Sequence, residues 1–328
     1  MQWAVGAAAA AVLAVVVIVF AVVLPGDDEE PTRETTTVER TTRSNERGNR
    51  ETEPRVTTVE VGGRPTVVAA GGGVVWVADS FAPRAAVLTS EAADANASSF
   101  RLDGAPADVA TDGDGAWYAL PEQQGVERRE ADEPAATGEV TSTDGFPAVV
   151  AATEGAVFAV SESSVETIDA ATGDSRAAVE LDGFATSAAA GEGYGWVVVE
   201  NREVVRIDPG SGEVDGDPIE VEKAFGIATG EGAAWVVSVS GTVTRIDPES
   251  LEVTSSPKPV RGALDVAAGL GSVWVSASDT AVIRLDPDTL EPQGKPLPVG
   301  DEPSSVSVGD EAAWVTNGAE GELTRIEP

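Results

Sequence analysis

The residue types that perform most enzyme chemistry are missing from this sequence. Its 328 residues include no histidine and no cysteine. Without histidine the chain lacks the commonest general base and metal ligand. Without cysteine it has no thiolate nucleophile, no disulfide and no zinc–thiolate site. The composition therefore favours a binding or scaffolding function over catalysis.

A loop position that recurs along the chain supplies the first candidate binding residues. It lies twelve residues before each of seven evenly spaced aromatic residues, and it holds Arg64, Ala105, Phe146, Phe184, Lys223, Gly262 and Glu302. The residue type changes at this position while the residues on both sides of it follow a regular pattern, which indicates a surface that binds a specific ligand. Ordinary variation between loops is the alternative. With cationic and aromatic residues from nearby loops, the predicted ligand-binding residues are Arg64, Phe146, Phe184, Lys223, Phe225, Arg84 and Arg202.

Oxygen-bearing side chains supply a second set of candidates, which are Asp79, Glu122, Asn201, Asp279 and Asn317. Carboxylate and amide oxygens are the ligands that Ca²⁺ prefers. A Ca²⁺ site, and with it a divalent-metal-dependent hydrolase or lactonase, is therefore the alternative to a binding function, although solvated loop acids explain the same residues. We expect no other cofactor. Asp112-Gly-Asp-Gly115 lacks the remaining ligands of a calcium loop, so we interpret it as a tight turn.

A repeat positions these loops. Its aromatic anchors are spaced 41, 41, 38, 39, 39 and 40 residues apart, at Trp76, Trp117, Phe158, Trp196, Trp235, Trp274 and Trp314. Seven residues before each anchor stands a small residue, at Ala69, Ala110, Ala151, Ala189, Ala228, Ala267 and Ser307. Only small side chains fit where strands crowd around an axis, so this row marks the innermost strands. The period predicts an all-β fold, a seven-bladed β-propeller with four-stranded blades; six blades, eight blades or a β-sandwich are the alternatives.

The strand endings and the last blade complete this prediction. The third strand of several repeats ends in Arg-Ile-Asp-Pro or a close variant, as at residues 206–209 and 245–248. An Asp side chain bonds the backbone two residues on and Pro presets a turn, so the motif predicts a strand followed by a turn. The last repeat stops one strand short of a full blade. We expect the strand Val56–Val61 to pair with Leu323–Ile326 and close the ring.

The pattern G-x-G-x-x-W-V followed by R-I-D-P-x-(S/T)-(G/L)-E-V resembles the YVTN/NHL-type propeller group over residues 56–328. That group includes virginiamycin B lyase-like proteins and the extracellular sensor propellers of actinobacterial serine/threonine kinases. The resemblance implies a propeller fold, and for the kinase receptors it implies a propeller that follows a single membrane helix. The lyase uses a catalytic histidine, which this chain lacks, and the kinase half is absent.

The N-terminal segment predicts a membrane anchor. From Trp3 to Leu24 there are 22 consecutive residues without a charge, and a helix of that length spans about 33 Å, enough to cross a bilayer. A cleaved signal peptide is the alternative, but the apolar run is long and no clear A-x-A site follows it. The acidic run Asp27–Glu30 favours an orientation in which the chain after the helix lies outside the cytoplasm. Arg33 and Arg40 weakly favour the opposite orientation. We therefore expect residues 1–24 to form a single-pass anchor in the cell membrane.

Residues 25–55 are rich in Thr, Glu and Arg and almost free of large apolar residues, so we expect a disordered tether before the propeller of residues 56–328. The formal net charge of −35 excludes nucleic acid binding through a basic surface. Solubility and adaptation to salt explain this acidity equally well. Together these features predict a monomeric, membrane-anchored, extracytoplasmic propeller that binds a protein, peptide or glycan, with a lyase-like or metal-dependent enzyme as the alternative.

Overall fold

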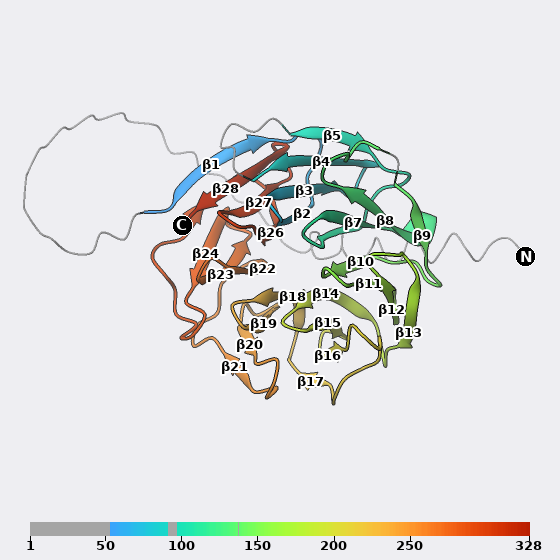
Figure 1. Cartoon of the computed structure of the whole chain (residues 1–328). Coiled ribbons are helices and arrows are strands. Elements are labelled where there is room, and N and C mark those ends of the chain that lie inside the picture. The colour runs from blue at the N-terminus through green and yellow to red at the C-terminus, as the bar shows by residue number, and fades with distance from the viewer. Residues whose placement is uncertain (1–52, 91–96, 137) are drawn as a thin grey trace, which may run out of the picture. The chain divides into compact units, whose positions relative to one another are not determined.

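The computed structural model describes residues 53–90, 97–136 and 138–328, and it is an all-β ring of seven four-stranded antiparallel sheets (Figure 1). The predicted anchor at residues 1–24 and nearly all of the predicted tether at residues 25–55 lie outside this part of the chain. Among the described residues, no helix has the length and apolar character needed to span a membrane. The seven-bladed, four-stranded architecture expected from the repeat is confirmed.

Blades 1 to 4 follow one another along the chain, each running from its innermost to its outermost strand. Blade 1 contains β2 (Val67–Gly71), β3 (Val74–Asp79), β4 (Arg84–Thr89) and β5 (Ser98–Arg101). Blade 2 contains β6 (Asp108–Thr111), β7 (Gly115–Leu120), β8 (Gly125–Glu130) and β9 (Val140–Ser142), with a 3-10 turn η1 (Pro121–Gln123) between β7 and β8. Blade 3 contains β10 (Val149–Ala152), β11 (Ala156–Val160), β12 (Ser164–Asp169) and β13 (Ser175–Glu180). Blade 4 contains β14 (Ala185–Gly191), β15 (Tyr194–Val199), β16 (Glu203–Ile207) and β17 (Ile219–Glu220).

Blades 5 to 7 continue the same order, and the last blade is completed from the other end of the domain. Blade 5 contains β18 (Ala224–Gly230), β19 (Ala233–Ser238), β20 (Val243–Ile246) and β21 (Val253–Ser255). Blade 6 contains β22 (Ala263–Gly269), β23 (Ser272–Ala277), β24 (Ala281–Leu285) and β25 (Leu297–Pro298). Blade 7 contains β26 (Pro303–Val308), β27 (Ala313–Asn317), β28 (Glu322–Glu327) and, as its outermost strand, β1 (Arg55–Glu60).

The strand register confirms both the anchors and the small residues opposite them. In every blade the anchor on the second strand pairs across the ladder with the small residue seven positions earlier on the innermost strand, as in Ala69↔Trp76 and Ser307↔Trp314. The predicted ring closure is also confirmed, because β1 pairs with β28 in the register Val56↔Ile326 and Val59↔Leu323. The innermost strand therefore needs a small side chain wherever a large ring lies beside it.

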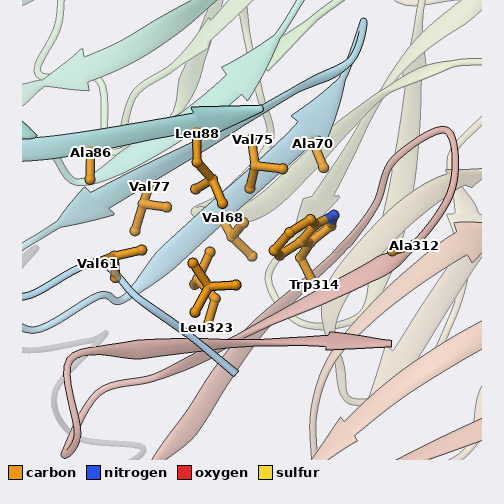
Figure 2. Close-up of a cluster of buried hydrophobic side chains, with 11 residues drawn as sticks. Val61, Val68, Ala70, Val75, Val77, Ala86, Leu88, Ala312, Trp314 and Leu323 are labelled. Atoms are coloured by element: carbon orange, nitrogen blue, oxygen red, sulfur yellow. The ribbon is translucent and has the colours of Figure 1, made fainter. Parts of the chain in front are cut away.

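The hydrophobic core is divided into seven clusters, one at each junction between neighbouring blades. Each anchor belongs to the cluster that its own blade shares with the next blade. Figure 2 shows the junction of blades 7 and 1, where Trp314 and Leu323 pack against Val68, Val75 and Val77. Every blade thus buries its anchor against the following blade.

The Arg-Ile-Asp-Pro motif serves both the blade and the turn after it. Its arginine lies across the ladder from the anchor, as in Trp196↔Arg206, and Arg206 reaches the next blade to donate a hydrogen bond to the Pro248 carbonyl at 2.5 Å. Its aspartate caps the turn: Asp208 Oδ1 accepts the backbone amides of Gly210 at 3.1 Å and Ser211 at 2.7 Å. These hydrogen bonds lower the pKa of the Asp208 carboxyl. The predicted turn at this motif is therefore confirmed.

Blade 2 also has an arginine across the ladder from its anchor, and next to it a buried ion pair. Arg128 lies opposite Trp117, and its Nε donates to Asp112 Oδ2 at 3.1 Å. Arg129, the next residue along β8, is buried in an ion pair with Glu127 and donates to the Arg101 carbonyl of blade 1 at 3.1 Å. Burial against blade 1 raises the pKa of the Glu127 carboxyl.

Replacing an anchor tests how far stability depends on these junctions. Trp235 is fully buried between blades 5 and 6 and donates its indole N–H to the Gly230 carbonyl at 2.8 Å. We expect Trp235→Ala to lower the free energy of unfolding by about 3–5 kcal/mol, because it leaves a large cavity in the core. Urea unfolding followed by circular dichroism measures this change. Phe184→Ala is the control, because that side chain is 55% exposed, and equal losses in the two variants would contradict the packing role.

Candidate functional site

All seven predicted ligand-binding residues lie on one face of the ring, which we call the top face. It is formed by the loops that join each outermost strand to the next blade and each second strand to the third. Arg64, Phe146, Phe184 and Lys223 lie just ahead of β2, β10, β14 and β18; Arg84 begins β4; Arg202 precedes β16; and Phe225 lies in β18. The opposite face holds the tight turns between first and second strands and the Asp-capped turns. The seven residues fall into two groups around the ring, with Phe146 between them.

The first group lies where blades 7 and 1 meet. The Arg64 guanidinium stacks on the Phe81 ring at 4.5 Å and pairs with Glu302 of blade 7 at 3.0 Å. Its backbone N–H donates to Asp79 Oδ2 at 3.0 Å. Phe81 remains 56% exposed. Arg64 and Phe81 therefore present a cationic and aromatic surface that is held in place from both blades.

Arg84, predicted with this group, is engaged inside the protein. Its Nη2 donates to the Val61 carbonyl at 2.8 Å and to Ser99 Oγ at 2.6 Å, which ties β4 to the segment that follows β1. A small cavity of about 10 Å³ lies beside it, lined in part by Gly62, Pro65 and Asp79, and it has room for roughly one water molecule. The Arg84 guanidinium thus fastens the closing segment to blade 1.

The second group lies on blades 4 and 5 and is more open. Phe184 is 55% exposed, and its backbone N–H donates to Glu200 Oε1 at 2.9 Å. Lys223 and Arg202 are exposed, and the nearest carboxylate to Arg202 is Glu203 at 4.0 Å. Within the described part of the chain Lys223 forms no ion pair with a carboxylate. This group offers free cationic and aromatic side chains to the solvent.

Besides Arg84, two predicted residues are half-buried, and both lie near the innermost strands. Phe225 lies at a register shift between Ala224 and Gly226 in β18 and packs against the core cluster of blades 5 and 6. Similar shifts occur at the same end of β14, β22 and β26. Phe146 precedes β10 in blade 3. An extra residue at a strand end redirects side chains, so these positions shape the mouth of the ring.

The predicted oxygen ligands do not gather at one point. Asp79 is buried and accepts the amides of Arg64 and Phe81, while Asn317 is buried and donates to Thr324 Oγ1 at 2.8 Å. Across residues 53–90, 97–136 and 138–328, no three Asp or Glu residues are grouped closely enough to hold a metal ion. Asp112 caps its own turn by accepting the Asp114 and Gly115 amides, so the interpretation of this segment as a tight turn is confirmed.

Two aspartates on innermost strands were not predicted as site residues. Asp108 in β6 accepts the Val150 amide of blade 3 at 3.0 Å, and Asp265 in β22 accepts the Val306 amide of blade 7 at 2.9 Å. Each carboxylate therefore links its innermost strand to the next one around the ring. Enclosure by the protein raises the pKa of Asp108 to about 7 and that of Asp265 to about 6, and the Asp265 charge adds to the effect on Asp108.

A sequence signal for these two residues exists. Both lie two residues before the small residue of an innermost strand, where the other repeats have Val67, Val149, Ser187, Gly226 and Ser305. A carboxylate is unusual at a position so close to the axis of the ring, and it needs a hydrogen-bond partner there. Val239, which is 72% exposed on the top face between β19 and β20, was also missed. It gives no signal, because a valine beside a strand is ordinary.

The two raised pKa values predict how stability depends on pH. A carboxyl whose pKa is raised by folding contributes stability in full below its ordinary pKa and loses it as the pH rises through the folded value. Between pH 5 and pH 8 we therefore expect the wild-type protein to lose roughly 1–3 kcal/mol of unfolding free energy. Asp108→Asn keeps an oxygen for the Val150 amide and cannot ionise, so its pH dependence should be flatter.

Chemical denaturation at several pH values measures this slope. Asp182→Asn, at an exposed position on the top face, is the matched control and should retain the wild-type slope. An unchanged slope in Asp108→Asn would show that this carboxyl does not titrate in that range.

Comparison with known proteins supports the fold. No protein-family model matches the chain, and no curated protein matches it. Among solved structures, the chain is similar to selenomethionine-substituted virginiamycin B lyase from Staphylococcus aureus, with 16% identity and a TM-score of 0.70 over 84% of this chain and 100% of the lyase. The same values hold for a catalytically inactive form of that lyase, with a histidine replaced by alanine, in a structure with quinupristin.

Other propellers are similar at comparable distance. A streptogramin B lyase structure matches with 15% identity and a TM-score of 0.68, over 84% of this chain and 97% of the lyase. BamB from Moraxella catarrhalis matches with 13% identity and a TM-score of 0.56, over 83% of this chain and 91% of BamB. Likeness at these identities shows the fold alone, and it agrees with the resemblance to virginiamycin B lyase-like propellers noted from the repeats.

Proposed function

We propose that this chain is a membrane-anchored, extracytoplasmic propeller whose top face binds or scaffolds a protein, peptide or glycan, as a sensor or interaction module. One observation carries the proposal. Of the five large hydrophobic side chains that are exposed in the described residues, the three most exposed, Phe81, Phe184 and Val239, all lie in top-face loops. Exposed apolar side chains gathered on one face are typical of an interaction surface.

The anchoring part of the proposal is supported by the sequence. Residues 3–24 carry no charge and have the length of a spanning helix, and the acidic run Asp27–Glu30 follows them. Residues 25–55 have the composition of a solvated tether. With such a segment ahead of it, the propeller stands outside the membrane as a single-pass protein.

The absence of histidine separates this chain from the lyases that it resembles in fold. The lyase form in which a histidine is replaced by alanine is catalytically inactive, and this sequence contains no histidine at all. A lyase reaction on this scaffold would need a different general base. The binding function needs only the exposed side chains that the top face already presents.

Site-specific photocrosslinking tests the binding function. A photoreactive amino acid replaces Phe184 on the top face, and in a matched variant it replaces Val214, which is 39% exposed on the opposite face. In membranes of the producing cell we expect a discrete crosslinked product from position 184 and none from position 214. Changing Phe146→Ala and Lys223→Glu should then reduce that product while the thermal unfolding transition stays in place. Identical products from both positions, or none from position 184, would contradict a ligand-binding top face.

A metal-dependent hydrolase is the second candidate, and two acidic residues on innermost strands favour it. Asp108 and Asp265 have raised pKa values of about 7 and about 6, a range that suits proton transfer near neutral pH. If these carboxylates hold a divalent ion, added Ca²⁺ should raise the melting temperature of the wild-type protein. The double variant Asp108→Asn with Asp265→Asn should lose that response. A melting temperature that does not respond to Ca²⁺ in the wild-type protein removes this candidate.

A further inference from the structure

Blade 5 has an uneven distribution of charge between its two ends. From Lys223 to Leu264 the acidic residues are Glu231, Asp247, Glu249 and Glu252. Glu231 lies in the turn between β18 and β19, and the other three lie between β20 and β21, so all four belong to the face opposite the top face. Between Lys223 and Leu264 the top end of this blade has no acidic residue, in a chain that has 56 of them, and Glu222 directly precedes that segment.

Cationic side chains occupy that end instead. Lys223 precedes β18, and Lys258 and Arg261 lie between β21 and β22, where the chain passes from blade 5 to blade 6. All three are exposed. No ion pair involves any of the three within the described residues. Most arginines of the propeller, by contrast, are paired with a carboxylate, as Arg206 is with Asp215 at 2.5 Å.

An apolar side chain lies among these cations, and backbone hydrogen bonds hold the loops together. The Val239 amide donates to the Lys223 carbonyl at 2.9 Å, and the Val260 amide donates to the Gly241 carbonyl at 2.7 Å. These bonds join the β19–β20 loop to the segments on both sides of it. Val239, 72% exposed, therefore lies in a loop whose backbone is bonded to Lys223 on one side and to Val260, the neighbour of Arg261, on the other. We call Lys223, Val239, Lys258 and Arg261 the blade 5 patch.

We propose that the blade 5 patch docks an acidic peptide segment of a partner protein, with an apolar side chain of that segment packed on Val239. This inference rests on the binding function proposed above and names the class of partner. The net charge of −35 repels an acidic segment from the propeller as a whole. The top end of blade 5 offers an acidic segment three exposed cations that form no ion pair within the described residues.

The surroundings of the patch favour a peptide over a uniformly anionic surface. Exposed Glu222 and Asp279 border it on either side, so a membrane of anionic lipids or a polyphosphate would meet repulsion at its edges. A peptide spaces its charges and can place an apolar residue between them. Cations around an exposed apolar side chain fit that arrangement, because the apolar contact adds affinity that charge alone does not give.

Fluorescence anisotropy with a defined probe tests the proposal on the full chain in a nonionic detergent. The probe is a labelled peptide of glutamates with one central phenylalanine, and its control is the same peptide with glutamine in place of glutamate. We expect the wild-type protein to bind the glutamate peptide and to bind the glutamine peptide far more weakly. Binding should weaken as salt is added, because exposed charges are screened.

A matched pair of charge reversals locates the site. Lys223→Glu with Lys258→Glu should weaken binding of the glutamate peptide by about tenfold or more. The control is Arg101→Glu with Lys295→Glu, which makes the same change in net charge at two exposed positions that form no ion pair in the described structure. The affinity of this control for the glutamate peptide should stay within about twofold of the wild-type value. Val239→Ser should weaken binding severalfold without changing its salt dependence.

Several outcomes would overturn the proposal. The proposal is wrong if the protein does not bind the glutamate peptide, or if it binds the glutamine peptide equally well. It is also wrong if the two double variants weaken binding equally. A third contradiction would be Lys223-dependent binding to vesicles of anionic lipid that is stronger than binding to the peptide. The crosslinking experiment separates this failure from that of the general function. If the product from position 184 persists in Lys223→Glu with Lys258→Glu, the partner class is wrong while the top face still binds.

Discussion

The packing of each aromatic anchor against the next blade is the interaction on which this structure depends. None of the seven core clusters lies within a single blade, and each junction has its own anchor. A blade without its successor would leave a tryptophan or phenylalanine exposed. The ring must therefore close for the last anchor, Trp314, to be buried, and β1 and β28 complete the blade at which it closes.

The two faces of the ring differ in what their side chains contact. On the face opposite the site, acidic side chains hold neighbouring blades in order: Glu192 accepts the Gly232 amide at 3.1 Å, Glu231 accepts the Gly271 amide at 2.9 Å, and Asp310 accepts the Gly73 amide at 2.9 Å. These carboxylates are committed to junctions between blades. In the top-face loops of blades 4 and 5, the side chains of Phe184, Lys223 and Val239 are exposed to solvent and available to a ligand.

The fold could be predicted from the sequence because its determinants repeat. An anchor, a small residue seven positions earlier and a capping aspartate such as Asp208 recur with the blade, so each repeat supports the interpretation of the others. The closing strand was predictable because the last repeat lacked one. The anchor, the small residue and the capping aspartate depend on residues within one period of the chain, and the pairing of β1 with β28 follows from the count of strands.

The site was less predictable, because it depends on which residues of different blades become neighbours. Arg84 lies at the top face as expected, at the start of β4, yet its guanidinium donates hydrogen bonds to the Val61 carbonyl and to Ser99. No local pattern in the sequence reveals these bonds. Asp108 and Asp265 accept amides of the following blades, and enclosure by the folded ring raises their pKa values. The blade 5 patch is formed by the loops before β18, between β19 and β20, and between β21 and β22, so its charge balance appears only when residues are sorted by face.

The pairing of β1 with β28 also makes the ring's closure the place where a load on the preceding chain enters the propeller. A pull on the chain ahead of β1 reaches the propeller at Arg55, which pairs with Glu327 at the outer edge of blade 7. Six residue pairs, from Arg55↔Glu327 to Glu60↔Glu322, resist that load before it reaches blade 1. If they gave way, Val59 and Val61 would leave the cluster that surrounds Trp314. Tension along the chain would then loosen one junction first, while the blades that carry Phe184 and Lys223 would remain the last to feel it.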